Sequence, residues 1–194
     1  MSALAWCAAR TLYLFLPLLV SIALAAIVYR YDLVRWLKVP IDAGIEIGGK
    51  RLFGASKTWR GVAIALVGSV AGVALQRHVL AAVARSVAII DYSRVSPLAL
   101  GLTMGAAATA GELPNSFVKR RLGIEPGATA RHPALRVVFW IWDQVDLLIF
   151  AWPTLLLWVR PSADIVIASF VLALVVHPAL AWVGHAIGAR KTAR

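Results

Sequence analysis

Five long apolar runs alternate with polar, mostly basic segments along the chain. The runs approach or reach the roughly 20 residues that an α-helix needs to cross the hydrocarbon core of a bilayer. The pattern therefore predicts an all-α integral membrane bundle of about five transmembrane helices, at residues 11–29, 61–76, 96–111, 135–158 and 163–183. The second and third runs are short and rich in Gly and Ala, which allow close helix contact, so we expect them inside the bundle.

The composition agrees with this pattern. Hydrophobic residues make up 61% of the 194 residues, and the mean hydropathy is +0.80, whereas soluble domains are usually nearer half apolar. We expect one membrane-embedded domain over residues 1–194. The formal net charge of +11 would suggest nucleic acid in a soluble protein, but in a membrane protein basic loops set topology and bind phosphates or anionic headgroups. We therefore predict no nucleic-acid partner.

The basic residues are distributed unequally between the two sides of the predicted bundle. Most Lys and Arg fall in the segments 30–60 and 111–134 and in the C-terminal tail. The positive-inside rule places these segments on the cytoplasmic side of the cytoplasmic membrane. The N-terminus is then outside the cell membrane and the C-terminus is in the cytoplasm. The two long cytoplasmic loops then share one face. Gly- and Ala-rich helices are also compatible with a homodimer.

The first of these loops combines glycines with cations. Gly48, Gly49 and Gly54 free the backbone to curl, and the polar side chains beside them suit the oxygens of a polyphosphate. The candidate phosphate-binding residues are Lys50, Arg51, Lys57, Thr58 and Arg60. An ordinary basic cytoplasmic loop is the alternative interpretation of the charge. The acids Asp42 and Glu46 are expected to be solvated.

The second loop carries a hydroxyl and cations with helical spacing. Asn115 or Ser116 is expected to cap a short helix after Pro114. Lys119 and Arg120 follow Ser116 by three and four residues, so on a helix all three share one face and form a phosphate clamp, with Arg121 adjoining. A juxtamembrane basic cluster that binds anionic lipid is the alternative.

Asp143 and Asp146 are two acids within the fourth apolar run. Residues three apart share a helix face, and each charge in the membrane is costly, so a cation partner is expected. Mg²⁺ prefers carboxylates together with substrate phosphates. Glu112 is positioned to join Asp143 and Asp146 as a metal ligand. A structural ion pair to Arg131 or Arg136 is the alternative.

Residues 49–61, 115–127 and 143–146 together resemble the CDP-archaeol synthase family, which is related to the phosphatidate cytidylyltransferases. The resemblance implies that CTP and an isoprenoid ether-lipid phosphate give CDP-lipid and pyrophosphate, with Mg²⁺. It also implies catalytic roles for Lys119, Arg120, Asp143 and Asp146. Family members often have an acid at the position of Ala55 and Asp at the position of Glu112.

Two other function classes fit parts of the pattern. In a small transporter, Asp143 and Asp146 would form an ion relay. That class predicts further polar residues through the outer half of the helices, where few are present. A non-catalytic protein that binds anionic lipid would explain the basic loops but not the costly acids. The sequence therefore favours the lipid cytidylyltransferase.

Overall fold

The computed structural model describes residues 2–80, 86–186 and 188. Across these residues the chain is mostly helical. It forms α1 (Ala3–Leu14), α2 (Leu16–Arg30), α3 (Trp59–Leu75), α4 (Pro97–Arg121), α5 (Pro133–Leu155) and α6 (Ala163–Ala186), with the short strands β1 (Glu46–Ile47) and β2 (Lys50–Arg51). A 3-10 turn occupies Arg35–Leu37, and π-helical turns at Gln76–Leu80 extend α3. The predicted helical class is confirmed, with the hairpin as a small addition.

By length and composition, the described residues give fewer candidate membrane spans than the apolar runs predict. They contain two helices able to cross a bilayer, Trp59–Val79 and Ala163–Ala186. The bent pair of α1 and α2 raises the number to three if it forms one span. The charged residues of α4 and α5 weaken their apolar signal. The five-span arrangement therefore stays a prediction.

The first predicted helix is in fact two helices. The chain bends by 60° between α1 and α2, and Phe15 lies at the break. Pro17 lacks a backbone N–H and cannot continue the ladder to the carbonyl of Tyr13. That carbonyl instead accepts a hydrogen bond from the side chain of the fully buried Gln76. The carbonyl left free at the break between α1 and α2 thus holds the C-terminal end of α3 through Gln76.

The third predicted helix is much longer than expected. Ser96 accepts a hydrogen bond from the Ala99 amide and Pro97 opens the helix, as the sequence suggests. The helix then continues through Pro114 to Arg121. The expectation that residues 111–127 form a loop with a separately capped short helix is wrong for most of that segment. Neighbouring helices can support a helix through an internal proline.

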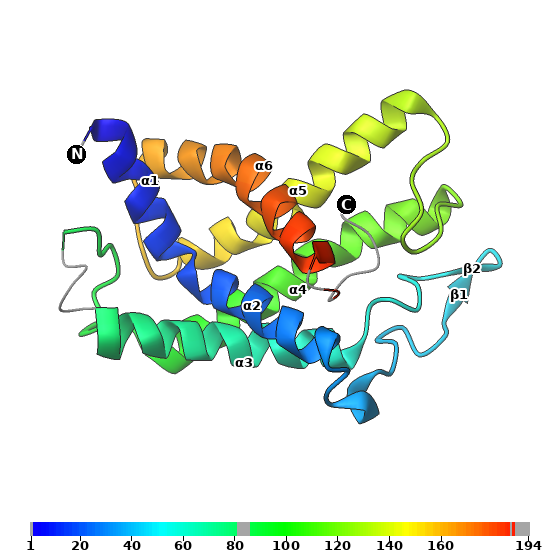
Figure 1. The fold of residues 1–194 in the computed structure, drawn as a ribbon, viewed down its shortest axis with the longest axis horizontal. Helices are drawn as coiled ribbons and strands as arrows, with labels where there is room; N and C mark the ends of the chain where they lie inside the picture. Colours follow the sequence, from blue (N-terminus) through cyan, green and yellow to red (C-terminus); the bar gives the residue numbers. More distant parts are fainter. Residues whose placement is uncertain (1, 81–85, 187, 189–194) are drawn as a thin grey trace.

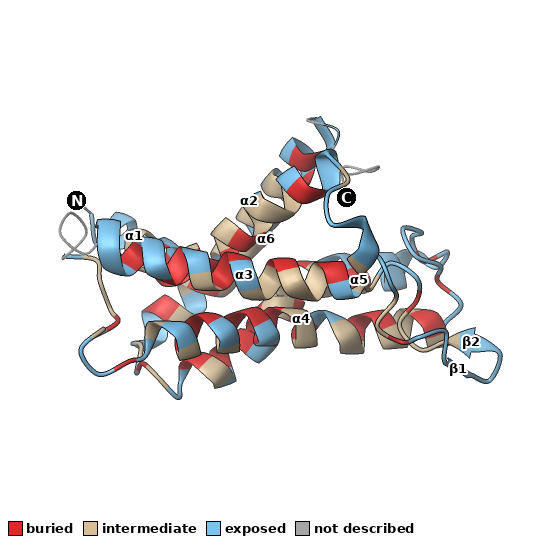
Figure 2. Cartoon of the chain, turned by 90° about the horizontal axis from the view of Figure 1, so that it is seen from below, coloured by how far each residue is buried: buried red, intermediate tan, exposed pale blue. Residues whose placement is uncertain are grey.

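Close packing around α3 and α4 fixes the centre of the bundle. α3 packs between α2 and α4, and α4 also packs against α5; α3 and α4 lie side by side (Figures 1 and 2). A Cβ added to Gly68 would lie 2.5 Å from the Ser21 Cα, and one added to Gly72 would lie 2.4 Å from the Pro17 Cα. The small residues of these helices are therefore interior, as predicted.

One face of α6 carries a stripe of exposed apolar side chains. Ile167, Val171 and Val175 recur every four residues and are 63%, 58% and 64% exposed. Side chains at this spacing share a helix face. A continuous exposed apolar stripe on a long apolar helix is the surface expected next to lipid. The chain is accordingly an integral membrane protein.

Gly111 lets α4 approach α5 closely. A Cβ at this position would lie 2.5 Å from the Asp146 carbonyl oxygen. We expect Gly111→Ala to lower the free energy of unfolding by about 1–3 kcal/mol, because the helices must move apart. Thermal unfolding in detergent measures the effect. The matched control is Gly61→Ala, where the new Cβ would meet only Tyr29 Oη at 3.5 Å; equal stability losses for both variants would contradict the prediction.

Candidate functional site: an acidic pair facing a basic chamber

Asp42 organises the segment between α2 and α3. Its side chain is fully buried. The carboxylate accepts hydrogen bonds from the backbone N–H groups of Gly44, Phe53 and Gly54 at 3.0–3.1 Å, and from Arg51. Burial by itself would raise the pKa of Asp42, but Arg51 and the backbone donors outweigh it and lower the pKa to about 2. The expectation of a solvated Asp42 is therefore wrong, whereas Glu46 is exposed as predicted.

Replacing Asp42 removes an acceptor shared by the whole segment. We expect Asp42→Ala to destabilise the protein by about 3–5 kcal/mol, because Arg51 and three N–H groups lose their buried partner. The midpoint of thermal unfolding in detergent reports this change. Glu46→Ala, which removes an exposed carboxylate from the same segment, is the control and should leave the midpoint almost unchanged. A stable Asp42→Ala protein would show that the segment is organised by other contacts.

Three of the predicted phosphate ligands instead join the two basic segments to each other. The Arg121 guanidinium donates to the carbonyls of Lys50 and Arg51 at 2.7 Å and to that of Ile47. The Lys50 ammonium returns a hydrogen bond to the Arg121 carbonyl at 2.8 Å. The hairpin therefore docks on the end of α4 (Figure 1). Phosphate contacts from Lys50, Arg51 and Arg121 stay predictions.

Arg60 and Thr58 also have roles in the fold. Arg60 is buried and donates to the Asp32 carboxylate at 2.7 Å and the Leu33 carbonyl at 3.2 Å. Its guanidinium lies over the Tyr29 ring. Thr58 is the N-cap of α3, accepting from the Gly61 amide at 3.4 Å. Arg60 thus fixes the turn after α2, and a phosphate contact from it stays a prediction.

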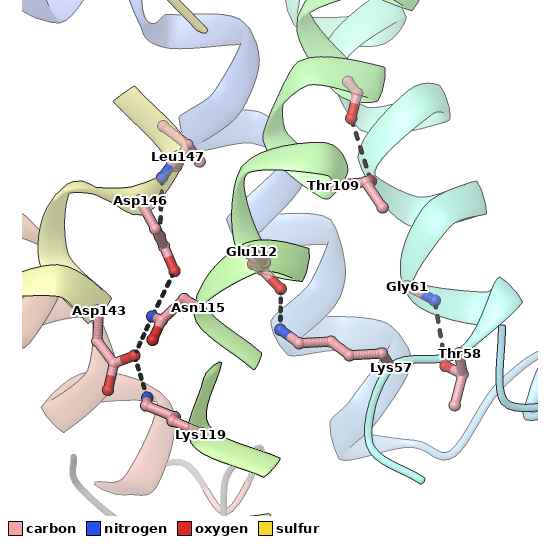
Figure 3. Close-up of polar contacts among 11 residues, drawn as sticks. Lys57, Thr58, Gly61, Thr109, Glu112, Asn115, Lys119, Asp143, Asp146 and Leu147 are labelled. Atoms are coloured by element: carbon pink, nitrogen blue, oxygen red, sulfur yellow. Dashed lines mark hydrogen bonds and ion pairs between the residues drawn. The ribbon is translucent and has the colours of Figure 1, made fainter. Parts of the chain in front are cut away.

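The acidic pair lies between α4 and α5 (Figure 3). The Asn115 side-chain amide donates to Asp143 Oδ1 at 2.6 Å and to Asp146 Oδ2 at 3.0 Å. Lys119 also pairs with Asp143. Asn115 and Asp146 are buried, whereas the Asp143 side chain is 46% exposed. The alternative, an ion pair from these acids to Arg131 or Arg136, is not found among the described residues, where Asp143 pairs with Lys119.

Asn115 is a site residue for which the sequence suggested only a role as helix cap, at Asn115 or Ser116. Because α4 continues through Pro114, Glu112, Asn115, Ser116 and Lys119 follow helical spacing. Treating Pro114 as internal to a helix would have placed Asn115 on the same helix face as Glu112 and Lys119. Within the described residues its Oδ1 is buried without a hydrogen-bond partner.

A polar chamber of about 690 Å³ lies against the acidic pair. It is lined by the second basic segment, the acids and two aromatic rings: Ser116, Lys119, Arg120, Phe139, Trp140, Asp143 and Asp146. Arg120 is 8% exposed. Over the part of the chain that the structure describes, its Nε and Nη1 atoms have no hydrogen-bond partner, and Glu125 lies 4.0 Å away. A buried guanidinium with free donors is suited to an anion.

Glu112 of α4 forms an ion pair with Lys57, which lies in the segment just before α3 (Figure 3). Burial would lower the pKa of Lys57, but the Glu112 charge outweighs burial and raises it, so Lys57 is cationic. Among the described residues, no three His, Cys, Asp or Glu side chains are grouped closely enough to hold a metal ion. The predicted three-carboxylate site is thus not assembled, and Glu112 faces Lys57.

The remaining pair of acids fits a divalent cation. Asp143 and Asp146 converge on one point, now taken by the Asn115 nitrogen. Exchange of the nitrogen and oxygen of the Asn115 amide would turn its unpartnered Oδ1 to that point. Two carboxylates and an amide oxygen are donors that Mg²⁺ accepts, and Mg²⁺ commonly completes its shell with water and substrate phosphate.

The fold and this chamber define a helical membrane protein with a cavity lined by buried cations and a pair of carboxylates. A family model for CarS-like CDP-archaeol synthases matches residues 6–192, and the chain belongs to that family. A CDP-archaeol synthase of Thermofilum pendens is 34% identical over 87% of this chain and 72% of its own length. Another, from Pyrobaculum aerophilum, is 30% identical over 81% of this chain and 83% of its own.

Two further similarities cover different shares of the aligned chains. A CDP-archaeol synthase of Halobacterium salinarum is 38% identical over 58% of this chain, and the match spans 56% of that relative's length. A solved structure, of an intramembrane enzyme for archaeal membrane lipid biosynthesis, shares the fold with a TM-score of 0.61. It is 26% identical, and the alignment covers 87% of this chain and 90% of that one.

Proposed function

We propose that this protein is a CTP-dependent cytidylyltransferase that converts a membrane lipid phosphate to CDP-lipid and pyrophosphate. One observation carries the proposal: the buried Arg120 guanidinium, whose Nε and Nη1 have no hydrogen-bond partner among the described residues, shares a chamber with the convergent carboxylates of Asp143 and Asp146. A cation bound to the acids and the fixed cations opposite them would together neutralise a nucleoside triphosphate. The family membership agrees with this activity.

The reaction would need positioning and charge neutralisation more than proton transfer. A lipid phosphate is already ionised at neutral pH, so its oxygen can attack the α-phosphorus of CTP without a general base. The bond from that phosphorus to the bridging oxygen breaks, and pyrophosphate leaves with the electron pair. Mg²⁺ held by Asp143 and Asp146 would supply charge stabilisation for the leaving group.

The chain's own residues have distinct parts in this proposal. Arg120, Lys119 and Ser116 would bind the nucleotide phosphates from one side of the chamber. Lys57, at its opposite side, would contact the lipid phosphate. Phe139 and Trp140 line the chamber and offer aromatic faces to the base. The hairpin contacts of Arg121 and Lys50 would act indirectly, by fixing the end of α4 that carries Arg120.

Orientation in the membrane follows from the same proposal. CTP is a cytoplasmic nucleotide, so the chamber would face the cytoplasm, with the N-terminus outside and the C-terminus inside. This agrees with the positive-inside distribution of Lys and Arg. A homodimer stays a prediction from the small residues of the helices.

The test uses purified protein in liposomes with labelled CTP and Mg²⁺. Phosphatidic acid and an isoprenoid ether-lipid phosphate are offered in parallel, and CDP-lipid and pyrophosphate are measured. We expect both products in equal amounts, with EDTA abolishing the reaction and Mg²⁺ restoring it. CTP binding without product from either lipid would point to another acceptor. Absence of CTP binding would overturn the proposal in favour of a transporter or an anionic-lipid-binding protein.

A further inference from the structure

Gly54 contacts two of the cations that line the polar chamber, Lys57 and Arg120. It is buried and lies between the hairpin and α3. Its carbonyl accepts a hydrogen bond from the backbone N–H of Lys57 at 3.2 Å. A Cβ added to Gly54 would lie 3.4 Å from the Cδ and 3.5 Å from the Nε of Arg120. One residue therefore touches the backbone of one cation and the side chain of the other.

Asp42 fixes the position of Gly54. The Asp42 carboxylate accepts hydrogen bonds from the N–H groups of Gly54 at 3.0 Å and Phe53 at 3.1 Å. Because Arg51 pairs with the same buried carboxylate, the turn cannot shift without disturbing an ion pair. Gly54 also meets the wall of the chamber, since an added Cβ would lie 3.2 Å from the Pro126 Cγ. The turn at Gly54 is thus a fixed support for that wall.

The Arg120 side chain depends on packing for its direction. Within the described residues, its Nε and Nη1 atoms have no hydrogen-bond partner, and the Glu125 carboxylate is 4.0 Å away. Contacts along the stem therefore determine where the guanidinium points. Gly54 makes such a contact, and its φ of +97° is a conformation that side chains other than glycine's rarely allow. A residue with a Cβ would be strained there and would press on the stem of Arg120.

We propose that Gly54 is a positioning residue that sets the separation between the nucleotide phosphates on Arg120 and the lipid phosphate on Lys57. The inference rests on the proposed function for the roles of these two cations. Attack on phosphorus requires the reacting atoms to be aligned at close range, and a misplacement of about 1 Å can cost about 100-fold in rate. A residue tied to both cations therefore affects turnover without touching either substrate.

The experiment compares Gly54→Ala with Gly44→Ala. Gly44 has a similar φ of +86°, and an added Cβ there meets nothing within 4 Å. Its N–H also donates to the Asp42 carboxylate, at 3.1 Å. Both variants thus carry similar backbone strain and keep a hydrogen bond to Asp42, but only Gly54→Ala presses on Arg120. Turnover is measured in liposomes with CTP and a lipid phosphate, at a temperature below the unfolding midpoints of both variants.

We expect Gly54→Ala to lower kcat/KM about 10-fold and Gly44→Ala to keep it within about 2-fold of wild type. In an Arg120→Gln background, Gly54→Ala should cost little further activity, because both substitutions act on the same guanidinium. A purely structural role predicts additive losses instead. Equal losses in the two glycine variants, or additive losses with Arg120→Gln, would overturn the positioning role while leaving the cytidylyltransferase in place.

Phenylglyoxal modification of Arg120 gives a second readout that needs no turnover. This reagent attacks accessible guanidinium groups, and Arg120 is buried, so its modification in the wild-type protein should be slow. If the wild-type protein forms no CDP-lipid, the proposed function fails and this comparison still tests the contact. Faster modification of Arg120 in Gly54→Ala than in Gly44→Ala, followed by peptide mass spectrometry, supports the positioning role, and equal rates reject it.

Discussion

Asp146→Asn is expected to lower CDP-lipid formation at least about 1000-fold, because a metal-held charge at the leaving group contributes several kcal/mol. The substitution keeps the size of the side chain and removes one of two carboxylates that converge on a single point. Asp146 is 6% exposed and Asp143 is more open, so bulk water cannot readily take the place of the carboxylate oxygen that is lost at Asp146. Activity as a function of Mg²⁺ concentration measures the loss.

Two comparisons separate a metal role from a structural one. Asp91→Asn makes the same chemical change at an exposed loop position, where the carboxylate bonds to Ser93, and should leave turnover unchanged. Mn²⁺ binding followed by electron paramagnetic resonance should weaken in Asp146→Asn and not in Asp91→Asn. Wild-type turnover with an unaltered Mg²⁺ requirement in Asp146→Asn would remove this residue from the site.

Arg120→Gln should lower kcat/KM by about 100- to 1000-fold, the range found when one fixed donor to a developing anion is removed. Arg120 brings buried donors to the chamber that lack partners among the described residues. Arg120→Lys should recover only part of the activity, because an ammonium cannot reproduce the planar, two-point contact of a guanidinium. Steady-state kinetics with varied CTP measures both variants.

The control for Arg120 is Arg94→Gln, at an exposed position whose partner is Asp91. It tests whether any loss of positive charge lowers activity through weaker membrane attachment. Arg120 also packs against Gly54, whose added Cβ would lie 3.4 Å from the Arg120 Cδ, so the thermal midpoint is measured alongside. A decrease in stability with full activity would make Arg120 a packing residue and contradict the phosphate contact.

The sequence predicted those features of the protein that depend on a single dominant physical effect. Long apolar runs can only be buried or placed in lipid, so the helical membrane class and most helix positions could be predicted. Asp143 and Asp146 are conspicuous for the same reason: a charge in an apolar run is costly and needs a partner. Helix period then places them on one face, and the structure brings that face against Asn115 and Lys119.

The sequence could not show which Lys and Arg residues support the fold and which face the chamber. Their side chains are chemically similar, and the difference lies in the partners that the tertiary structure gives them. Arg60 and Arg51 are held by Asp32 and Asp42, which come from more distant parts of the same segment. Arg121 turns to backbone carbonyls of the hairpin, while its neighbour Arg120 faces the chamber. Among the described residues, Arg51, Arg60 and Arg121 each have one buried donor atom without a partner, whereas Arg120 has two, and this difference depends on long-range packing.

The sequence alone determined that this chain is a basic, helical membrane protein with an acidic pair and two cationic segments, because hydrophobicity and helix period act locally. Only the tertiary structure decided that α4 continues through Pro114 and brings Asn115 to the acids. It also decided that Asp42 is buried and accepts hydrogen bonds from the segment between α2 and α3. These features depend on contacts between residues far apart in the chain, whose free energies no local pattern contains.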